Sequence, residues 1–448
     1  MAASVTTRFA PSPTGHLHLG NARIAIINCL LARRHQGRWL LRVDDTDPAR
    51  SREEFLTAIC EDLRWLDLSW DECIRQSRRT DLYAQAFAEL EARGRVYPCY
   101  ETPEELAQLR RQQQERGLPP RYDRRARALS DQMHRELARS GRRPYWRFLL
   151  EDREVAFRDL VFGERRVPPG ALGDPVVRRE DGGFTYLFAS VVDDVALGIT
   201  HVVRGEDHLP NTAAQIQIFE ALRAAPPRFA HLPLLLDAEG RPLAKRHGGL
   251  TLRELRARGL EPRAVVAWLA RLGTGRSAGP EDDWERLCAD LDLARYGRQP
   301  ARVDLAELER LSARVLHRLS FAEVRPRLVE LGLADADPAF WALVRGNLST
   351  LAEARGWWQV VRGVIEPVVV DPDLLREAAA RVPDRIADPE EARRWLRSLQ
   401  KATGRRGREL YRPLRLALTG REHGPELHLL LPELGAERIR ARLEGRRA

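Results

Sequence analysis

The fold is decided by residues 5–43, which read VTTRFAPSPTGHLHLGNARIAIINCLLARRHQGRWLLRV. Val5–Phe9 predicts a short strand, which the following prolines break, and Leu19 to about His35 predicts a helix. Trp39–Val43 is short and mostly apolar, as expected of a second, buried strand. Strand, helix and strand at this spacing indicate parallel βα units. We therefore predict an α/β fold with a Rossmann-type parallel sheet.

The pattern continues outward from this stretch. Ser51-Arg-Glu-Glu54 matches a capping box and predicts the start of another helix. Thr80–Arg93 predicts a helix that ends at Gly94. Between residues 97 and 186, prolines, arginines and short β-like pieces such as Val155–Phe162 predict a small α+β insertion.

Beyond the insertion, the alternation of strand and helix resumes. We expect a strand at Ile199–Val203, a helix at Leu209–Arg223 and a strand at Leu232–Leu236. From Thr251 onward the sequence predicts helices to its end, with turns at several prolines that include Pro326. The predicted regions are 1–96 and 187–250 as the two halves of a Rossmann-type catalytic domain, 97–186 as the α+β insertion, and 251–315 and 316–448 as an all-α C-terminal half.

Composition excludes several classes of protein. The 448 residues are 43% hydrophobic and 31% charged, which predicts a globular protein of several domains. No apolar run approaches the ~20 residues of a bilayer span, and the first residues lack the basic and apolar regions of a signal peptide. The five cysteines form no C-x-x-C pair, so we expect no disulfide scaffold. We expect a cytoplasmic protein with no membrane partner.

The types of basic residue are more informative than their number. Lys and Arg total 74 against 65 Asp and Glu, and the net charge of +9 is compatible with a polyanionic partner. Of the 74 basic residues only Lys245 and Lys401 are lysines. A lysine in a chain that otherwise uses arginine is a candidate functional residue, because a compact ammonium differs from a planar guanidinium. Chance survival of two lysines is equally open.

The first candidate for chemistry is the turn after the first strand, which carries His16 and His18 just before Gly20. In a parallel sheet, ligands bind at the carboxyl ends of the strands, where helix N-termini offer unpaired N–H groups. An imidazole at this position can donate to a phosphate oxygen. Two ordinary surface histidines remain the alternative.

The second candidate is Arg42-Val-Asp-Asp-Thr-Asp47, directly after the second strand. Three carboxylates in four residues could ligate Mg²⁺ or bind a substrate ammonium. They could equally favour the dipole of the helix that starts near Ser51.

The third candidate is residues 240–249, which read GRPLAKRHGG after an apolar strand. A cationic loop with glycines at both ends can close over a polyphosphate and neutralise the charge that develops on a leaving pyrophosphate. A solvated basic loop would have the same composition.

Taken together, these stretches resemble the glutamyl branch of the class I aminoacyl-tRNA synthetases. Phe9-Ala-Pro-Ser-Pro-Thr-Gly with His18-Leu-Gly-Asn21 is similar to the first signature of that class, and Lys245-Arg246 to the second. The further stretches that fit are Arg42–Asp47, Tyr186-Leu-Phe-Ala-Ser-Val-Val-Asp-Asp194, His201-Val-Val-Arg-Gly-Glu-Asp-His208 and, more weakly, Val344–Thr350 and Trp357-Trp358. The resemblance implies an enzyme that joins L-glutamate to ATP and passes the glutamyl group to the terminal adenosine of tRNA(Glu).

The resemblance implies a role for each matching residue. Glutamate would be bound by Arg8, Ala10, Ser12, Asp44, Tyr186 and Arg204, with Arg8 on the side-chain carboxylate and Asp44 on the α-ammonium. ATP would contact His16, His18, Gly20, Asn21, Glu206 and Lys245. The catalytic residues would be His18, Lys245 and Arg246, which stabilise the transition state as pyrophosphate leaves. Mg²⁺ would arrive with ATP, and no protein nucleophile is required.

The helical half would contact the RNA. The resemblance implies that 97–186 binds the acceptor end, 251–315 contacts the stem and 316–448 binds the anticodon, in a monomer. Residues 401–448 hold 12 basic and 6 acidic side chains, an excess of +6 that suits an RNA-facing surface as well as a solvated helix. Arg345 is the candidate for an anticodon contact, because arginine can stack on or hydrogen-bond unstacked bases.

This chain departs from the family's pattern at several positions. Pro242 and Ala244 stand where the second signature usually has a lysine and a serine, which would slow the first step. Asp44 replaces the frequent glutamate, and Ser190 a frequent asparagine. Some relatives bind zinc in the insertion, but Cys99 is followed by Glu101 where a paired cysteine would stand, so we expect no zinc.

Several alternatives remain open within and beyond this branch. The enzyme could charge tRNA(Gln) with glutamate, alone or beside tRNA(Glu). A shorter relative that glutamylates a modified base would lack the helical half, and a glutamine-specific ligase would carry β-barrels there. A non-catalytic tRNA-binding paralogue would explain Pro242 and Ala244, but it would not be expected to keep Arg8, Asp44 and Lys245.

Overall fold

The computed structural model describes residues 4–237, 239–241, 243 and 250–448. The chain forms two compact units. Unit 1 comprises residues 1–255 and 265–304, and unit 2 comprises residues 256–264 and 305–448. The chain passes from one unit to the other within α8 (Leu252–Ala257), within α9 (Pro262–Arg271) and between residues 304 and 305.

The centre of unit 1 is a parallel sheet in two parts. In the first part β2 (Arg38–Val43) lies between β1 (Thr6–Phe9) and β3 (Glu72–Arg75), all parallel. The second part has the order β7-β6-β10-β9, in which β9 (His201–Gly205) and β10 (Arg228–Leu232) are parallel. The two parts meet at β1 and β9, where the Thr200 amide donates to the Thr6 carbonyl over 3.0 Å.

This order matches the predicted Rossmann-type sheet. Strands β2 and β3 lie on one side of β1, and β9, β10 and β6 lie on the other, so the strand order reverses between β1 and β9. The crevice outside the carboxyl ends of the strands at such a reversal is where open α/β sheets bind ligands.

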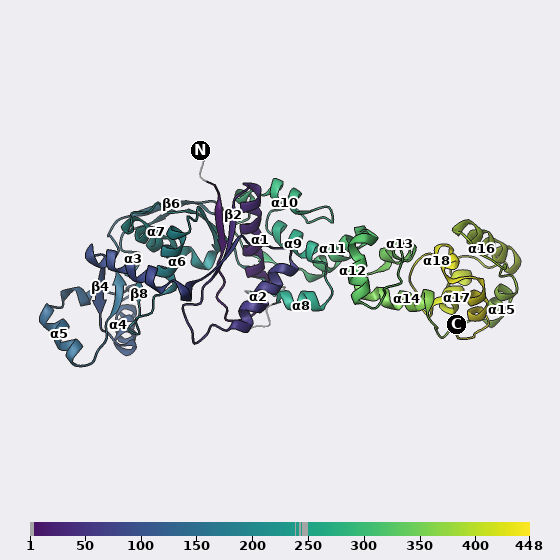
Figure 1. Ribbon diagram of the computed structural model, residues 1–448, viewed down its shortest axis with the longest axis horizontal. Coiled ribbons are helices and arrows are strands. Elements are labelled where there is room, and N and C mark those ends of the chain that lie inside the picture. The colour runs from purple at the N-terminus through teal and green to yellow at the C-terminus, as the bar shows by residue number, and fades with distance from the viewer. Residues whose placement is uncertain (1–3, 238, 242, 244–249) are drawn as a thin grey trace. The chain divides into compact units, whose positions relative to one another are not determined.

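Helices cover the sheet on both sides (Figure 1). The helix α1 (Leu19–Arg34) packs against β1, β2 and β9 and also against α10 (Trp284–Asp290). On the other side, α3 (Thr80–Ala92), α6 (Tyr186–Ala196) and α7 (Leu209–Ala221) share one apolar core with residues of the sheet. Burial of these aromatic and aliphatic side chains, each worth about 1.5–3 kcal/mol, holds the layers together.

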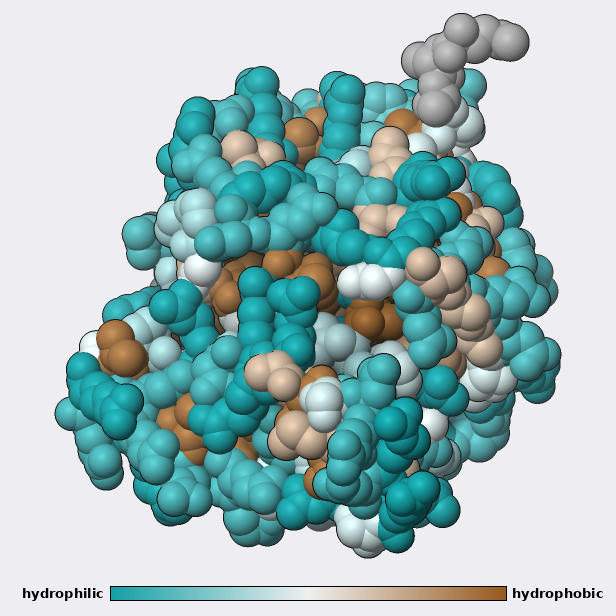
Figure 2. Space-filling model, turned by 90° about the vertical axis from the view of Figure 1, so that its left-hand side faces the viewer, coloured by the Kyte–Doolittle hydropathy of each residue, from teal (hydrophilic) through white to brown (hydrophobic). Residues whose placement is uncertain are grey.

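The insertion has its own three-stranded antiparallel sheet, in the order β4-β5-β8. Its strands are β4 (Val96–Cys99), β5 (Tyr145–Phe148) and β8 (Val176–Arg178), and its helices are α4 (Pro103–Glu115) and α5 (Asp131–Arg139). The outer face of this part of unit 1 is mostly hydrophilic, and hydrophobic residues show mainly within its hollows (Figure 2).

The β-like piece predicted at Val155–Phe162 within the insertion pairs elsewhere. The strand β6 (Val155–Asp159), with its antiparallel partner β7 (Gly163–Val167), joins the main sheet beside β10. The sequence could not indicate this, because β6 reaches β10 across about seventy intervening residues and only the assembled sheet offers the partner.

Two local predictions in unit 1 also differ from the structure. No side chain caps α2 (Glu53–Trp65), and the Ser51 hydroxyl has no partner among the described residues, so the predicted capping box is wrong. The Asp47 carboxylate instead accepts from the backbone amides of residues 49 and 50. The strand predicted at Leu232–Leu236 is split between β10 and the short β11 (Leu235–Leu236), which pairs with β12 (Ala301–Arg302) inside the predicted helical half.

Unit 2 is helical, as predicted. Its helices beyond residue 304 are α11 (Leu305–Arg318), α12 (Phe321–Glu330), α13 (Pro338–Val344), α14 (Ala354–Arg362), α15 (Pro372–Ala380), α16 (Pro389–Thr403), α17 (Arg408–Thr419), α18 (Leu427–Leu434) and α19 (Ala436–Leu443). Three of them begin with proline, whose missing N–H costs nothing at that position. Pro326, by contrast, lies inside α12 and not at a turn. It is exposed, so the carbonyl that loses its partner can face water.

Among the residues that the structure describes, no helix is both long and apolar enough to cross a bilayer.

Candidate active site

A cavity of about 390 Å³ lies in unit 1 at the carboxyl ends of β1 and β9, where the strand order reverses. Seven residues predicted from the sequence line it: Arg8, Ala10, His18, Gly20, Asn21, Tyr186 and Arg204. They come from β1, the loop after it, the start of α1, the start of α6 and the end of β9. The fold therefore gathers most of the predicted glutamate and ATP contacts at one place.

Four other predicted residues lie outside the cavity lining. Ser12 is exposed, and the His16 ring packs edge-on against Phe55 with 5.5 Å between ring centroids. Asp44 is buried behind the wall, where its backbone amide donates to the carbonyl of Pro11 over 3.0 Å. The Glu206 carboxylate lies at the rim of the cavity, where it accepts from the backbone amide of Leu234, a lining residue, over 2.8 Å.

A network of buried charges fixes Arg8 and Asp44. The Arg8 Nε donates to Asp194 Oδ1 over 3.1 Å, and Arg42 donates from NH1 to the same carboxylate and from Nε to Asp44, both over 2.7 Å. These four side chains are at most 5% exposed. Burial raises the pKa of Asp44 to about 6, although the Arg42 guanidinium opposes this. Arg42 and Asp194 therefore position the two predicted glutamate contacts that the sequence placed far apart.

Arg204 is different, because its guanidinium is buried without an acid. It is 5% exposed and lines the cavity. Its Nε donates to the His231 Nε2 over 3.0 Å and its NH2 to Thr212 Oγ1 over 2.8 Å. No carboxylate of the described residues forms an ion pair with it. Burial lowers its pKa. An unpaired buried cation at a cavity wall attracts an anionic ligand.

His18 caps the helix that points into the cavity. Its Nδ1 accepts from the backbone amides of Gly20, over 3.1 Å, and Asn21, over 3.4 Å, at the start of α1. A ring that accepts at Nδ1 carries its proton on Nε2. A Cβ at residue 20 would lie 3.0 Å from the His18 ring, so the glycine makes room for this cap. The turn thus presents an imidazole donor beside a helix N-terminus, where anions are favoured.

Lys245, Arg246, Pro242 and Ala244 lie outside the described residues. The residues on either side of this segment are bonded near the cavity: Leu243, which lines it, donates to the Leu235 carbonyl over 2.9 Å, and the Leu250 carbonyl accepts from the amide of Leu19 over 3.2 Å.

Sequence reasoning missed several residues of the site. Arg42 and Asp194 lie in motifs that were recognised, and an arginine within an apolar strand was a usable signal. Asp207, not Glu206, lines the cavity, and Arg23 lines it from α1 while donating to the carbonyls of Pro233 and Leu272. Nothing in the sequence singled out Arg23 among so many arginines.

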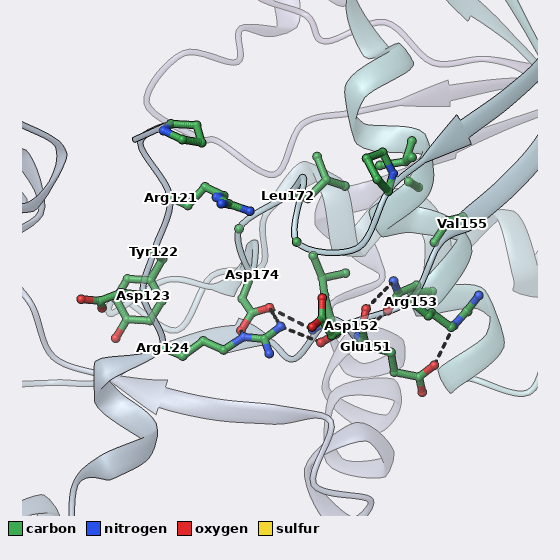
Figure 3. Close-up of a pocket in the computed structure, with 18 of the residues that line it drawn as sticks. Arg121, Tyr122, Asp123, Arg124, Glu151, Asp152, Arg153, Val155, Leu172 and Asp174 are labelled. Carbon is green, nitrogen blue, oxygen red and sulfur yellow. Dashed lines mark hydrogen bonds and ion pairs between the residues drawn. The ribbon is translucent and has the colours of Figure 1, made fainter. Parts of the chain in front are cut away.

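A second cavity, of about 320 Å³, lies between the insertion and the strand β6 (Figure 3). Its buried carboxylate, Asp174, accepts from Tyr97 over 2.7 Å, from Arg124 over 2.9 Å and from the Leu150 amide over 3.0 Å. This buried acid therefore has its donors within the protein and joins the segments that meet at the cavity.

The region that holds zinc in some relatives is built differently here. The Glu101 carboxylate accepts from the hydroxyls of Tyr122, over 2.6 Å, and Tyr145, over 3.0 Å, while Cys99 is buried beside them. Among the residues that the structure describes, no three His, Cys, Asp or Glu side chains form a group that could hold a metal ion.

In unit 2, Arg345 begins a 3₁₀ turn, Arg345–Asn347, directly after α13. It is half-buried, and its NH1 donates to the carbonyl of Leu319 over 3.4 Å.

Comparisons with known proteins define the class to which this fold and site belong. Residues 4–295 match the family described as "tRNA synthetases class I (E and Q), catalytic domain", and residues 370–446 match an "Anticodon binding domain". The first match covers the whole parallel sheet and the cavity. Arg345 lies outside both matches.

Within this class, the chain belongs to the glutamate–tRNA ligase family. It is 51% identical over 449 residues to "Glutamate--tRNA ligase 2" of Methylorubrum populi, with 100% of both chains covered. It is 48% identical to "Glutamate--tRNA ligase 1" of Parvibaculum lavamentivorans, with 99% of each chain covered. A crystal structure of a glutamate tRNA ligase from Elizabethkingia meningosepticum in complex with its amino acid is similar with a TM-score of 0.86, 26% identity and 98% of each chain covered.

Proposed function

We propose that the protein is a glutamate–tRNA ligase, which activates L-glutamate with ATP and transfers the glutamyl group to the terminal adenosine of tRNA(Glu). The observation that carries this proposal is the buried, acid-free guanidinium of Arg204 in the same cavity as the capped N-terminus of α1. The first suits a carboxylate of the amino acid, and the second suits the phosphates of a nucleotide.

Glutamate is held by Arg8, Ala10, Tyr186 and Arg204, and the buried carboxylate of Asp44, behind the cavity wall, supplies the negative charge for its ammonium. The charges around this part of the cavity support the assignment. Arg8 and Arg42 are paired with the buried carboxylates of Asp44, Asp193 and Asp194, whereas Arg204 has no carboxylate partner among the described residues. L-glutamate has two carboxylates and one ammonium, so Arg204 offers a cation that no protein carboxylate neutralises to one of the substrate carboxylates. Ser12 is exposed on the loop after β1, so we assign it the weakest contact with glutamate.

ATP is held by His18, Gly20 and Asn21 at the start of α1, with Glu206 at the rim and Mg²⁺ brought by the nucleotide. Leu243 and Leu250, the described neighbours of the segment with Lys245 and Arg246, support the assignment of those two cations to the phosphates. We leave His16 out of the ATP contacts, because its ring packs on Phe55 outside the cavity.

The reaction needs position and charge more than a nucleophile. A carboxylate oxygen of glutamate attacks the α-phosphorus of ATP, a new P–O bond forms, and the bond to pyrophosphate breaks. Arg8 and Arg204 hold the attacking molecule, while His18, Lys245 and Arg246 neutralise the charge that grows on the leaving group. The adenylate then loses AMP as the ribose hydroxyl of the terminal adenosine attacks the glutamyl carbonyl.

The remaining assignments follow the same plan. The insertion binds the acceptor end, the helices after residue 250 contact the stem, and unit 2 with Arg345 binds the anticodon of tRNA(Glu) or tRNA(Gln). The match of residues 370–446 to an anticodon binding domain supports the last of these. The enzyme acts as a monomer in the cytoplasm, and its five unpaired cysteines suit a reducing compartment.

Charging of purified tRNA(Glu) and tRNA(Gln) with labelled glutamate, side by side, tests this proposal. We expect glutamyl-tRNA(Glu), and ATP–pyrophosphate exchange that depends on glutamate when tRNA is present. A chain that binds tRNA but forms no glutamyl-tRNA with either substrate would be a non-catalytic paralogue, and the proposal would be wrong. Charging of tRNA(Gln) alone would overturn the choice of tRNA(Glu) but not the reaction.

A further inference from the structure

A chain of three buried side chains runs across neighbouring strands to the cavity. Asp159 ends β6, His231 lies on β10, and Arg204 lies opposite His231 on β9. His231 Nδ1 is 2.6 Å from Asp159 Oδ2, and His231 Nε2 is 3.0 Å from Arg204 Nε. All three side chains are at most 5% exposed. Only Arg204, at the end of the chain, lines the cavity.

The partners fix where the proton of His231 lies. A guanidinium can only donate, so Nε2 accepts from Arg204, and Nδ1 therefore carries the proton and donates it to the carboxylate. Burial also lowers the pKa of His231, which keeps the ring neutral. Asp159 is itself fixed, because its Oδ1 accepts from the amides of Val161 and Phe162 over 2.9 and 2.8 Å.

The imidazole of His231 can accept a hydrogen bond from Arg204 without neutralising its charge, which a carboxylate in the same position could not do. A carboxylate against Arg204 would neutralise it and compete with the carboxylate of the substrate. His231 supplies an acceptor at the same place without a charge. With Nε held by His231 and NH2 held by Thr212, the plane of the guanidinium is set at two points while its charge stays available.

We propose that His231, oriented by Asp159, is a positioning residue that aims Arg204 at the carboxylate of the amino-acid substrate. The inference rests on the proposed function, because it takes Arg204 as a glutamate contact. His231 touches neither substrate nor the reacting atoms. It acts through Arg204, and its effect is therefore on glutamate and not on ATP.

Two substitutions at the same position separate positioning from packing. His231→Asn places its amide near Nδ1, keeps a donor for Asp159 and removes the acceptor for Arg204. His231→Gln places an oxygen near Nε2, keeps the acceptor for Arg204 and leaves Asp159 without its donor. We expect His231→Asn to raise the glutamate KM by about tenfold or more with the ATP KM unchanged. We expect His231→Gln to keep the glutamate KM within about threefold while lowering the Tm.

A third variant reverses the tautomer without touching the histidine. In Asp159→Asn the amide oxygen can keep the bonds to the amides of residues 161 and 162, so its NH₂ group faces His231 Nδ1 and the ring proton moves to Nε2. That proton then opposes the Arg204 Nε–H, and we expect the glutamate KM to rise as in His231→Asn. Long-range ¹⁵N NMR of the full chain should show His231 protonated at Nδ1, and at Nε2 in this variant.

The control is His201→Asn, a half-buried histidine at the other end of β9, which should leave both KM values unchanged. Equal loss of glutamate affinity in His231→Asn and His231→Gln, or a glutamate KM within twofold of wild type in His231→Asn, would overturn the inference. Calorimetric titration of each full-length variant with glutamate gives the same comparison without tRNA. If the wild-type protein neither binds nor transfers glutamate, it is the proposed function that fails.

Discussion

Replacing Arg204 by methionine should make the free protein more stable while it removes glutamate binding. The guanidinium is buried with neutral partners only, so the folded protein bears its desolvation cost without an ion pair. Removal of the guanidinium leaves His231 with a hydrogen-bond partner, since the Thr212 hydroxyl lies 3.2 Å from His231 Nε2 and can donate to it. Methionine has a similar length and fills the space with apolar atoms.

The magnitude follows from a comparison with Arg42. Replacement of a buried ion pair by well-packed apolar side chains is often stabilising by about 1–4 kcal/mol, and we expect the same range for Arg204, whose removal leaves no counter-charge behind. Arg42 instead bonds Asp44 and Asp194, and Arg42→Met would leave Asp44 buried without its cation, at a cost of about 3–5 kcal/mol. In a unit of this size 1 kcal/mol shifts the Tm by about 2 °C. The two variants should therefore shift the Tm of unit 1 in opposite directions, by about 2–8 °C upward and about 6–10 °C downward.

Differential scanning calorimetry of the two full-length variants at pH 7, with and without saturating glutamate, measures both effects. Glutamate should raise the Tm of the wild type and leave that of Arg204→Met unchanged. The reasoning would be refuted if Arg204→Met lowered the Tm as far as Arg42→Met does, because the guanidinium would then be stabilising in the empty site. It would also be refuted if the Arg204 variant kept its thermal response to glutamate.

Three further predictions concern other parts of the site. Burial raises the pKa of Asp44 to about 6, so its carboxylate gains a proton as the pH falls through 6 and can no longer pair with an ammonium. The glutamate KM should therefore rise below pH 6. Asp44→Asn should abolish that pH dependence. Lys245→Arg keeps the charge but should slow adenylate formation, whereas the matched Lys401→Arg, on α16, should not. Equal rates of ATP–pyrophosphate exchange in the two variants would mean that adenylate formation does not require a lysine at position 245. Asp193 is fully buried and accepts from Gln76, Arg79 and Tyr83. In a urea titration, Asp193→Ala should lower the free energy of unfolding of unit 1 by about 3–5 kcal/mol. A loss below about 1 kcal/mol would contradict this prediction.

Local features of the fold could be predicted because neighbouring residues decide them. The strand before Pro11, the helix from Leu19 and the helix that ends at Gly94 depend on apolar periodicity and on backbone geometry within a few residues. Even here a competing local contact can override the pattern, since the carboxylate of Asp47, and not the Ser51 hydroxyl, accepts from backbone amides before α2.

Candidate residues could also be named from the sequence, since motifs keep their residue types and spacing. Their arrangement could not. The charge network of Arg8, Arg42 and Asp194 and the chain from Asp159 through His231 to Arg204 join residues that lie up to 186 positions apart. These contacts exist only because β6, β10, β9 and β1 become neighbours in one sheet.

Sequence alone thus determined which chemical groups this protein has available and the local strands and helices that carry them. Only the tertiary structure decided which of its many arginines is paired with an acid and which is left with neutral partners. The physical reason is that the cost of burying a charge depends on partners supplied by other strands, and no local pattern records those partners.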